Sequence, residues 1–337
     1  MVRQVLVIGD VTYDEFIDLQ KMESFQVEAN SESHARLVDV YLQKSKKSYL
    51  GATARTCRYV QTMGCDVSYA GILGHDDTSS QITTAMRKLG IQTHLIHQQQ
   101  GLSPQKYQVF RSQKSEFIIR SDLSPLPSEE SLNILSHNVL HKLNDFDAVV
   151  ISFTKQQKLH LSTQKLIRDI ISRHNRVYVE PTEHGLVLGQ ADVADSEIAL
   201  YQGAFCLKAN RHEVSHLTHI SIDSNDDRLR ALRFMHERFD IKHPCITLDC
   251  EGAICLDKNG ELVTVRQNAC EPVNVYGCGE VFFSTLLALN VYGYAIGQDT
   301  LRSAVKNAKY YAQHPPEEVR SWPDILKDIN SDLKPDK

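Results

Sequence analysis

A glycine-flanked segment near residue 280 carries the residues best suited to chemistry. Gly277, Cys278, Gly279 and Glu280 stand directly before residues 281–295, an apolar stretch that predicts a helix. Two glycines one residue apart let backbone N–H groups converge on an anion, and the positive end of the helix dipole adds to the attraction. Glu280 brings a carboxylate that could accept the proton of an attacking hydroxyl. The segment therefore predicts a phosphoryl-transfer site, although the same spacing also serves turns that only pack closely.

The composition bounds the class of protein. The chain has 337 residues, of which 42% are hydrophobic and 23% charged, as in ordinary globular domains. Its net charge of −5 gives no electrostatic basis for binding nucleic acid. No apolar run reaches the roughly 18 residues of a membrane span, and residues 2–10 read as a first buried strand without a signal-peptide cleavage pattern. We expect a cytoplasmic protein without a membrane partner.

The eight cysteines lack the C-x-x-C pairs of zinc sites. Cys245, Cys250 and Cys255 follow one another at five-residue intervals in a strand-like region. We expect reduced thiols, most of them buried as small apolar residues.

Strands alternate with helices along most of the chain. Predicted strands cover residues 5–8, 67–73, 148–151, 176–180, 204–208, 245–248 and 253–256, and predicted helices cover residues 52–63, 79–89, 159–173 and 227–239. Buried apolar strands separated by helices predict an α/β fold, with a mostly parallel central sheet between two helical layers. Ligands of such sheets bind outside the carboxyl ends of the strands. The His-Pro-Pro run at 314–316 is expected to end the last helix.

Two segments do not fit this alternation. Residues 12–48 and 105–122 have strand composition, and within the second segment residues 107–110 and 116–120 predict a hairpin. We expect them to form a small β lid on a single domain of residues 1–330, with 331–337 as a tail. Because a small sheet has exposed edges, two such lids could pair in a homodimer.

The segment at residues 274–280 resembles the D-T-x-G-A-G-D signature of the ribokinase-like (PfkB) carbohydrate kinases. Further motifs are similar to signatures of the same family: residues 9–14 to G-D-x-x-x-D, 51–55 to G-G-A-x-N, 71–77 to V-G-x-x-G-x-D, and 210–213 to N-x-x-E. The resemblance covers most of the chain. It implies a ribokinase-like three-layer α/β/α fold and the ATP-dependent phosphorylation of a sugar or sugar phosphate.

The resemblance also implies roles for individual residues. The backbone N–H groups of Gly277, Cys278 and Gly279 would hold the transferring phosphate, and Glu280 would be the general base. The acceptor would contact Asp14, Gly51, Arg55, Lys106 and Arg120. The nucleotide would contact Asn210, Thr247, Asp249, Gly252 and Asn307. Asn210 and Glu213 would order Mg²⁺, directly or through water.

One turn in this set departs from the family pattern. Residues 247–252 resemble the nucleotide turn T-x-G-x-x-G, with Asp249 in place of its first glycine. If that position needs a positive φ, Asp is among the few residues that tolerate it.

One branch of the family fits best. Residues 106–122 resemble the lid segment T-K-x-R-V…L-I-R-x-D of the D-glycero-β-D-manno-heptose 7-phosphate kinases, which form the kinase domain of ADP-heptose synthase. Residues 151–155 and 179–182 are similar to their L-S-D-Y-x-K and I-D-P-K. An acceptor that already carries a phosphate would suit basic residues nearby, such as Lys106, Arg111 and Arg120.

Several active-site residues differ from the family pattern. Arg55 replaces an Asn, and Phe153, Glu180 and Glu280 each replace an Asp. A Glu accepts a proton as well as an Asp, but its extra methylene displaces the carboxylate. Two hypotheses follow. The chain is a sugar kinase with Glu280 as its base, or it is a catalytically weakened or inactive protein of the same fold that binds a nucleotide or sugar in a regulatory role.

Overall fold

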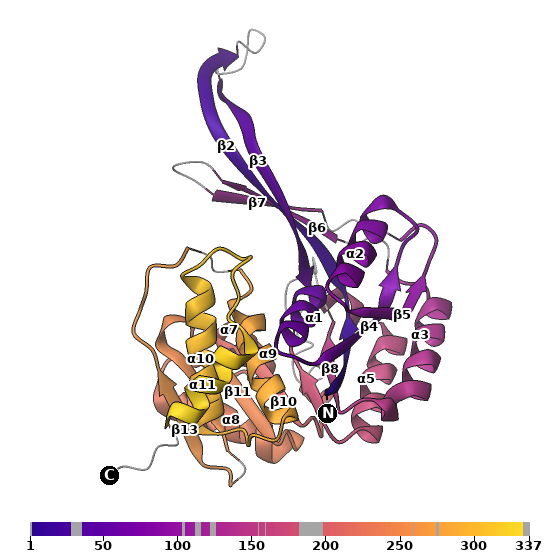
Figure 1. Cartoon of the computed structure of the whole chain (residues 1–337), viewed down its shortest axis with the longest axis vertical. Coiled ribbons are helices and arrows are strands. Elements are labelled where there is room, and N and C mark those ends of the chain that lie inside the picture. The colour runs from indigo at the N-terminus through magenta and orange to yellow at the C-terminus, as the bar shows by residue number, and fades with distance from the viewer. Residues whose placement is uncertain are drawn as a thin grey trace.

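Two sheets organise the chain (Figure 1). The computed structural model describes residues 2–27, 36–102, 105–111, 116–121, 126–153, 155–158, 160–181, 198–257, 259–273 and 276–332. Within these residues, no helix combines the length and apolar character that crossing a bilayer requires.

The larger sheet has nine strands in the order β13-β12-β11-β10-β9-β8-β1-β4-β5. Its strands are β1 (Gln4–Gly9), β4 (Asp66–Leu73), β5 (Gln92–Gln98), β8 (Ala148–Ser152), β9 (Val177–Val179), β10 (Cys206–Asn210), β11 (His243–Thr247), β12 (Gly252–Leu256) and β13 (Leu262–Arg266). Neighbours from β5 to β11 pair in parallel, and β12 and β13 are antiparallel. The expectation of a mostly parallel sheet is confirmed.

Helices cover both faces of this sheet. They are α1 (Thr53–Thr62), α2 (Asp77–Lys88), α3 (Glu129–Lys142), α4 (Lys155–Lys158), α5 (Leu161–Arg173), α7 (Arg211–Thr218), α8 (Asn225–Phe239), α9 (Cys278–Val291), α10 (Gln298–Ala312) and α11 (Trp322–Asp332). On β1, Val5 and Val7 join the core shared with α1, α9 and α10, while Leu6 and Ile8 join the core shared with α3, α5 and α8. The central strands β1 and β8 are buried along almost their whole length because both of their faces are covered, whereas the edge strands β5 and β13 carry exposed residues.

Five of the eight cysteines are buried and all are free thiols, as expected. Cys245 and Cys255 face each other across β11 and β12.

The smaller sheet has the order β3-β2-β6-β7. Its strands are β2 (Val11–Val27), β3 (Arg36–Ala52), β6 (Gln105–Arg111) and β7 (Glu116–Ser121). β2 follows β1 after one residue, pairs antiparallel with β3 and parallel with β6. The ribbon of β2 and β3 projects far from the body of the molecule (Figure 1). Residues 12–48 and 105–122, where a lid is expected, supply these strands.

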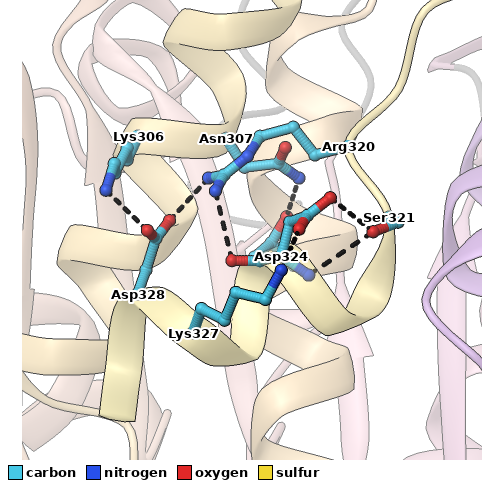
Figure 2. Close-up of polar contacts among 8 residues, drawn as sticks. Lys306, Asn307, Arg320, Ser321, Asp324, Lys327 and Asp328 are labelled. Atoms are coloured by element: carbon cyan, nitrogen blue, oxygen red, sulfur yellow. Dashed lines mark hydrogen bonds and ion pairs between the residues drawn. The ribbon is translucent and has the colours of Figure 1, made fainter. Parts of the chain in front are cut away.

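The C-terminal helix is joined to the body by polar contacts (Figure 2). Asp328 accepts hydrogen bonds from Lys306 of α10 and from Arg320, both at 2.6 Å. The expectation that residues 314–316 end the last helix was wrong, because α11 follows them. They do follow the end of α10, where Pro315 cannot continue a helix.

The junction between β3 and α1 is strained at Ala52. This residue has φ 46° and ψ −132°, and the family signature has a glycine there. Such a conformation costs a residue with a Cβ roughly 1–3 kcal/mol. Ala52 is held in it because Thr53 N donates to Asp10 O at 3.2 Å and α1 begins immediately.

Ala52→Gly is expected to raise the free energy of unfolding by about 1 kcal/mol, because relief of the strain exceeds the added chain entropy of glycine. Urea unfolding measures the change. The matched control Ala54→Gly, inside α1, should lower the same free energy by about 1 kcal/mol. Equal losses in both variants would contradict the assignment of strain to residue 52.

Candidate active site

A cavity of about 630 Å³ lies at the carboxyl ends of the central strands. Ser152 ends β8, Asn210 ends β10, Thr247 ends β11, and Glu180 follows β9. All of them line the cavity. Its other walls include residues of β2, α1, α10 and the segment that leads into α9. The cavity thus lies where an α/β sheet of this kind binds its ligands.

Glycines let the start of α9 approach other side chains closely. Gly277 precedes the helix with φ 99°, a conformation that favours glycine. A Cβ added to Gly277 would lie 2.9 Å from Arg55 Cδ, and one added to Gly279 would lie 2.8 Å from Lys208 Nζ. Cys278 lines the cavity between them, and burial raises its pKa to about 12, so its thiol stays protonated. The helix N-terminus and Lys208 together make this end of the cavity attractive to anions.

Arg55 joins the two carboxylates expected to contact the acceptor. Its Nη1 lies 3.0 Å from Glu280 Oε1, and its Nη2 forms an ion pair with Asp14. The side chains of Arg55, Asp14 and Glu280 are 13%, 9% and 22% exposed. They come from α1, β2 and α9, which are far apart in the sequence. The guanidinium therefore occupies the space between the two carboxylates.

Asp14 is held in a buried position by several neighbours. Burial raises its pKa, while the charge of Arg55 and a hydrogen bond from Thr12 Oγ1 oppose that rise. Gly51 lies opposite Thr12 on β3, and a Cβ added to it would lie 2.3 Å from Asp14 Oδ1. Gly51 is therefore needed for the close approach of β3 to this carboxylate.

Lys208 and Glu180 form a second, buried ion pair in the cavity. Nζ of Lys208 donates to Oε1 of Glu180 at 2.8 Å, and both side chains are less than a tenth exposed. Burial raises the pKa of Glu180 and the charge of Lys208 opposes that rise. Burial alone would lower the pKa of Lys208, but the carboxylates of Glu180 and Glu213 raise it overall.

Lys208 was not singled out as a site residue from the sequence, although its position in the strand could have indicated one. It is the one charged residue of β10, a strand that is otherwise apolar until Asn210 ends it. A lysine in a buried strand has to face a partner or a ligand, because an unpaired buried charge is costly.

The side chains of Asn210 and Glu213 form a capping box at the N-terminus of α7. Asn210 Oδ1 accepts from Glu213 N at 2.9 Å, and Glu213 Oε2 accepts from Asn210 N at 2.6 Å. Both residues line the cavity. Among the described residues, no group of three or more His, Cys, Asp or Glu side chains is arranged to hold a metal ion. These two side chains suit Mg²⁺ that is bound mainly by phosphate and water, as Mg²⁺ often is.

The residues expected to contact the nucleotide separate into two groups. Thr247, Asp249 and Gly252 line the cavity with Asn210. Asp249 has φ 52°, so a positive φ does occur where it replaces a glycine. Asn307 differs, because the residue is 3% exposed and its side chain donates to Thr285 Oγ1 at 2.8 Å, which joins α10 to α9.

The lid residues are placed by strand register alone. Lys106 on β6 lies opposite Tyr13 of β2, and Arg120 on β7 lies opposite Tyr107. The side chains of Lys106 and Arg120 lie outside the described part of the chain, as does that of Arg111. Phe16 of β2 does reach the cavity, where its ring packs edge to face against Tyr276 with centroids 5.7 Å apart.

Comparison with known proteins identifies the family. Residues 11–314 match the family model "pfkB family carbohydrate kinase". The chain is 24% identical over 299 residues to the bifunctional protein HldE of Aliarcobacter butzleri, and 26% identical over 302 residues to that of Trichlorobacter lovleyi. These matches cover 88% and 89% of this chain and 56% of each relative. The chain thus spans a little over half the length of these relatives.

Solved structures agree on the fold. Ribokinase of Arabidopsis thaliana complexed with ribose and ATP has a TM-score of 0.69 at 15% identity, with 98% of this chain and 99% of that chain covered. Phosphofructokinase-2 of Escherichia coli in complex with fructose-6-phosphate has a TM-score of 0.71 at 14% identity, with the same coverage. The fold is ribokinase-like, as the sequence predicted, and the chain belongs to the pfkB family of carbohydrate kinases.

Lys208→Met is expected to lower the free energy of unfolding by about 3 kcal/mol, because it leaves Glu180 buried without this cation. The double variant with Glu180→Gln should recover most of the loss. Urea unfolding of the single and double variants measures both.

Lys47→Met is the matched control for this comparison. Lys47 pairs with Glu317 at 2.9 Å, but both side chains are about half exposed. Surface pairs contribute at most about 1 kcal/mol. A similar loss of stability in both lysine variants would contradict the role assigned to burial.

Proposed function

We propose that this protein is an ATP-dependent kinase that phosphorylates a hydroxyl group of a sugar or a sugar phosphate, with Glu280 as the general base. The observation that carries the proposal is that the N-terminus of α9, Glu280 and Asp14 all line one cavity. A phosphoryl group needs donors around its oxygens, and its acceptor needs a base within hydrogen-bond reach. The backbone N–H groups at the start of α9 and the carboxylate of Glu280 would meet these two requirements within a few residues of one helix end.

The roles follow from the chemistry of each group. The N–H groups of Gly277, Cys278 and Gly279 would hold the transferring phosphate, and the cation of Lys208 would stabilise its negative charge. Asp14 would bind acceptor hydroxyls. Glu280 would remove the proton from the hydroxyl that attacks.

Magnesium and ATP are part of this proposal. Five carboxylates and three cationic side chains of the described residues line the cavity, so a nucleotide with several negative charges needs a counter-ion there. Asn210 and Glu213 would hold hydrated Mg²⁺, which neutralises phosphate charge when bound. Thr247, Asp249 and Gly252 would border the nucleotide.

A heptose 7-phosphate is the acceptor to test first. The proposal is supported by the resemblance of residues 106–122 to the lid of kinases for that sugar, and by the matches to HldE proteins. The smaller sheet would act as the lid of a single unit of residues 1–330, and two lids would pair in a homodimer of a cytoplasmic protein. Scattering in solution tests the dimer.

The Arg55 bridge favours a second candidate. A guanidinium between Asp14 and Glu280 fills the space in which the acceptor hydroxyl would lie. A protein in this state would bind nucleotide without phosphorylating a sugar, and would serve a binding or regulatory role. Consumption of ATP with a panel of sugars and sugar phosphates decides between the two. Turnover with one acceptor supports the kinase, whereas nucleotide binding without turnover on any acceptor supports the second candidate.

Glu280→Gln is expected to lower kcat by about 10²- to 10⁴-fold, because the amide cannot accept the proton of the attacking hydroxyl. Nucleotide affinity, measured by calorimetry, should stay within about twofold, since the N–H groups of the helix end remain.

Glu280→Asp is the control, since it keeps a proton acceptor one methylene shorter and should retain far more turnover than the amide. Unchanged kcat in Glu280→Gln would show that this carboxylate is not the base.

A further inference from the structure

The position of Arg55 sets a condition on the acceptor. In the proposed kinase, the acceptor would lie between Asp14, which binds its hydroxyls, and Glu280, which takes the proton of the attacking one, yet the guanidinium now links these two carboxylates. The three side chains are mostly buried, so water screens their attraction only weakly. An acceptor that enters the space between the two carboxylates would therefore draw part of the guanidinium away from one of them.

Neutral and anionic acceptors differ in their ability to do this. A hydrogen bond in which the donor or the acceptor is ionised is about twice as strong as one between neutral groups, and Coulomb attraction adds to it when both are ionised. A neutral hydroxyl would bind the guanidinium of Arg55 less strongly than the carboxylate of Glu280 does. It would therefore leave that ion pair in place, because a ligand shifts an equilibrium only by its differential affinity for the two states. A carboxylate or phosphate offers Arg55 an equivalent partner, and the planar guanidinium matches its geometry.

We infer that Arg55 selects acceptors that carry an anionic group, a carboxylate or a phosphate, close to the reacting hydroxyl, and that this group takes Nη1 of Arg55 from Glu280. Arg55 would keep its contact with Asp14 through Nη2. One anion would replace another beside the guanidinium, and Glu280 would be left with a greater affinity for a proton. Neutral sugars would leave Glu280 paired.

The catalytic consequence rests on the proposed kinase function. The released Glu280 takes the hydroxyl proton, and the hydroxyl oxygen forms a bond to the γ-phosphorus of ATP. The bond between that phosphorus and the bridging oxygen breaks, and ADP leaves with the electron pair. The selection of an anion, in contrast, is a property of binding and can be measured without turnover.

The test compares neutral and anionic members of matched sets. Calorimetry on the full chain with Mg²⁺ and ADP uses aldoses, the corresponding aldonates, and the corresponding aldose phosphates. We expect the tightest anionic member to bind at least about 10-fold more tightly than its neutral partner, and Arg55→Asn to remove that difference. The aldonates and the phosphates distinguish the two sources of negative charge. Equal binding of neutral and anionic members, or no binding of any anionic member, would overturn the inference.

Arg58→Asn is the matched control. Arg58 lies one turn further along α1, outside the cavity lining, with its guanidinium 5.7 Å from the ring centre of Tyr59. Its replacement removes the same charge from the same helix and should keep the preference for anions. Loss of the preference in Arg58→Asn as well would show a general effect of charge, and would overturn the role of Arg55.

Two further measurements keep the outcomes distinct. If Arg55→Asn does not fold, Arg55→Lys keeps the charge without the planar fork, and should weaken anion binding by about 10-fold. An unchanged affinity in that variant would overturn the inference. If anions bind as expected but no acceptor is phosphorylated, the selection stands and the kinase proposal fails.

Discussion

The buried guanidinium of Arg55 connects the three elements that form the part of the cavity proposed for the acceptor. Arg55 comes from α1, and its two carboxylate partners come from β2 and α9, at residues 14 and 280. Its stem passes so close to Gly277 that a Cβ there would lie 2.9 Å from Arg55 Cδ. Gly277 has a positive φ, and Gly51 approaches Asp14 closely. At both positions a Cβ would collide with a side chain of this ion-pair cluster. The geometry of the site therefore depends on a cation in a place where the family signature has an amide.

Ion pairs of buried side chains also determine the geometry of the rest of the cavity. Lys208 pairs with Glu180 on one side of the α9 N-terminus, as Arg55 pairs with both Asp14 and Glu280 on the other. Each of these three carboxylates is in contact with a cation, because an ionised group inside a protein is costly without one. A nucleotide or an acceptor that enters must compete with these internal pairs. The binding of a charged ligand is therefore coupled to the rearrangement of these ion pairs.

Much of the fold was predictable because its signals are local. Apolar runs such as residues 5–8 and 148–151 have to be buried on both faces, and the α9 start was marked by its glycines. The side-chain partners were not predictable in the same way. The sequence showed Arg55 and Glu180 as departures from a pattern, but their ion pairs join residues 225 and 28 positions apart. Such pairs depend on the packing of whole elements, as does the burial of Asn307 between α9 and α10.

The crystal structure of the protein with Mg²⁺ and a non-hydrolysable ATP analogue would test the site most directly. We expect the terminal phosphate on the backbone N–H groups of Gly277 to Gly279, beside Lys208, with Arg55 still between Asp14 and Glu280 because no acceptor is present. A terminal phosphate seated on the guanidinium of Arg55, or a nucleotide bound outside this cavity, would contradict it.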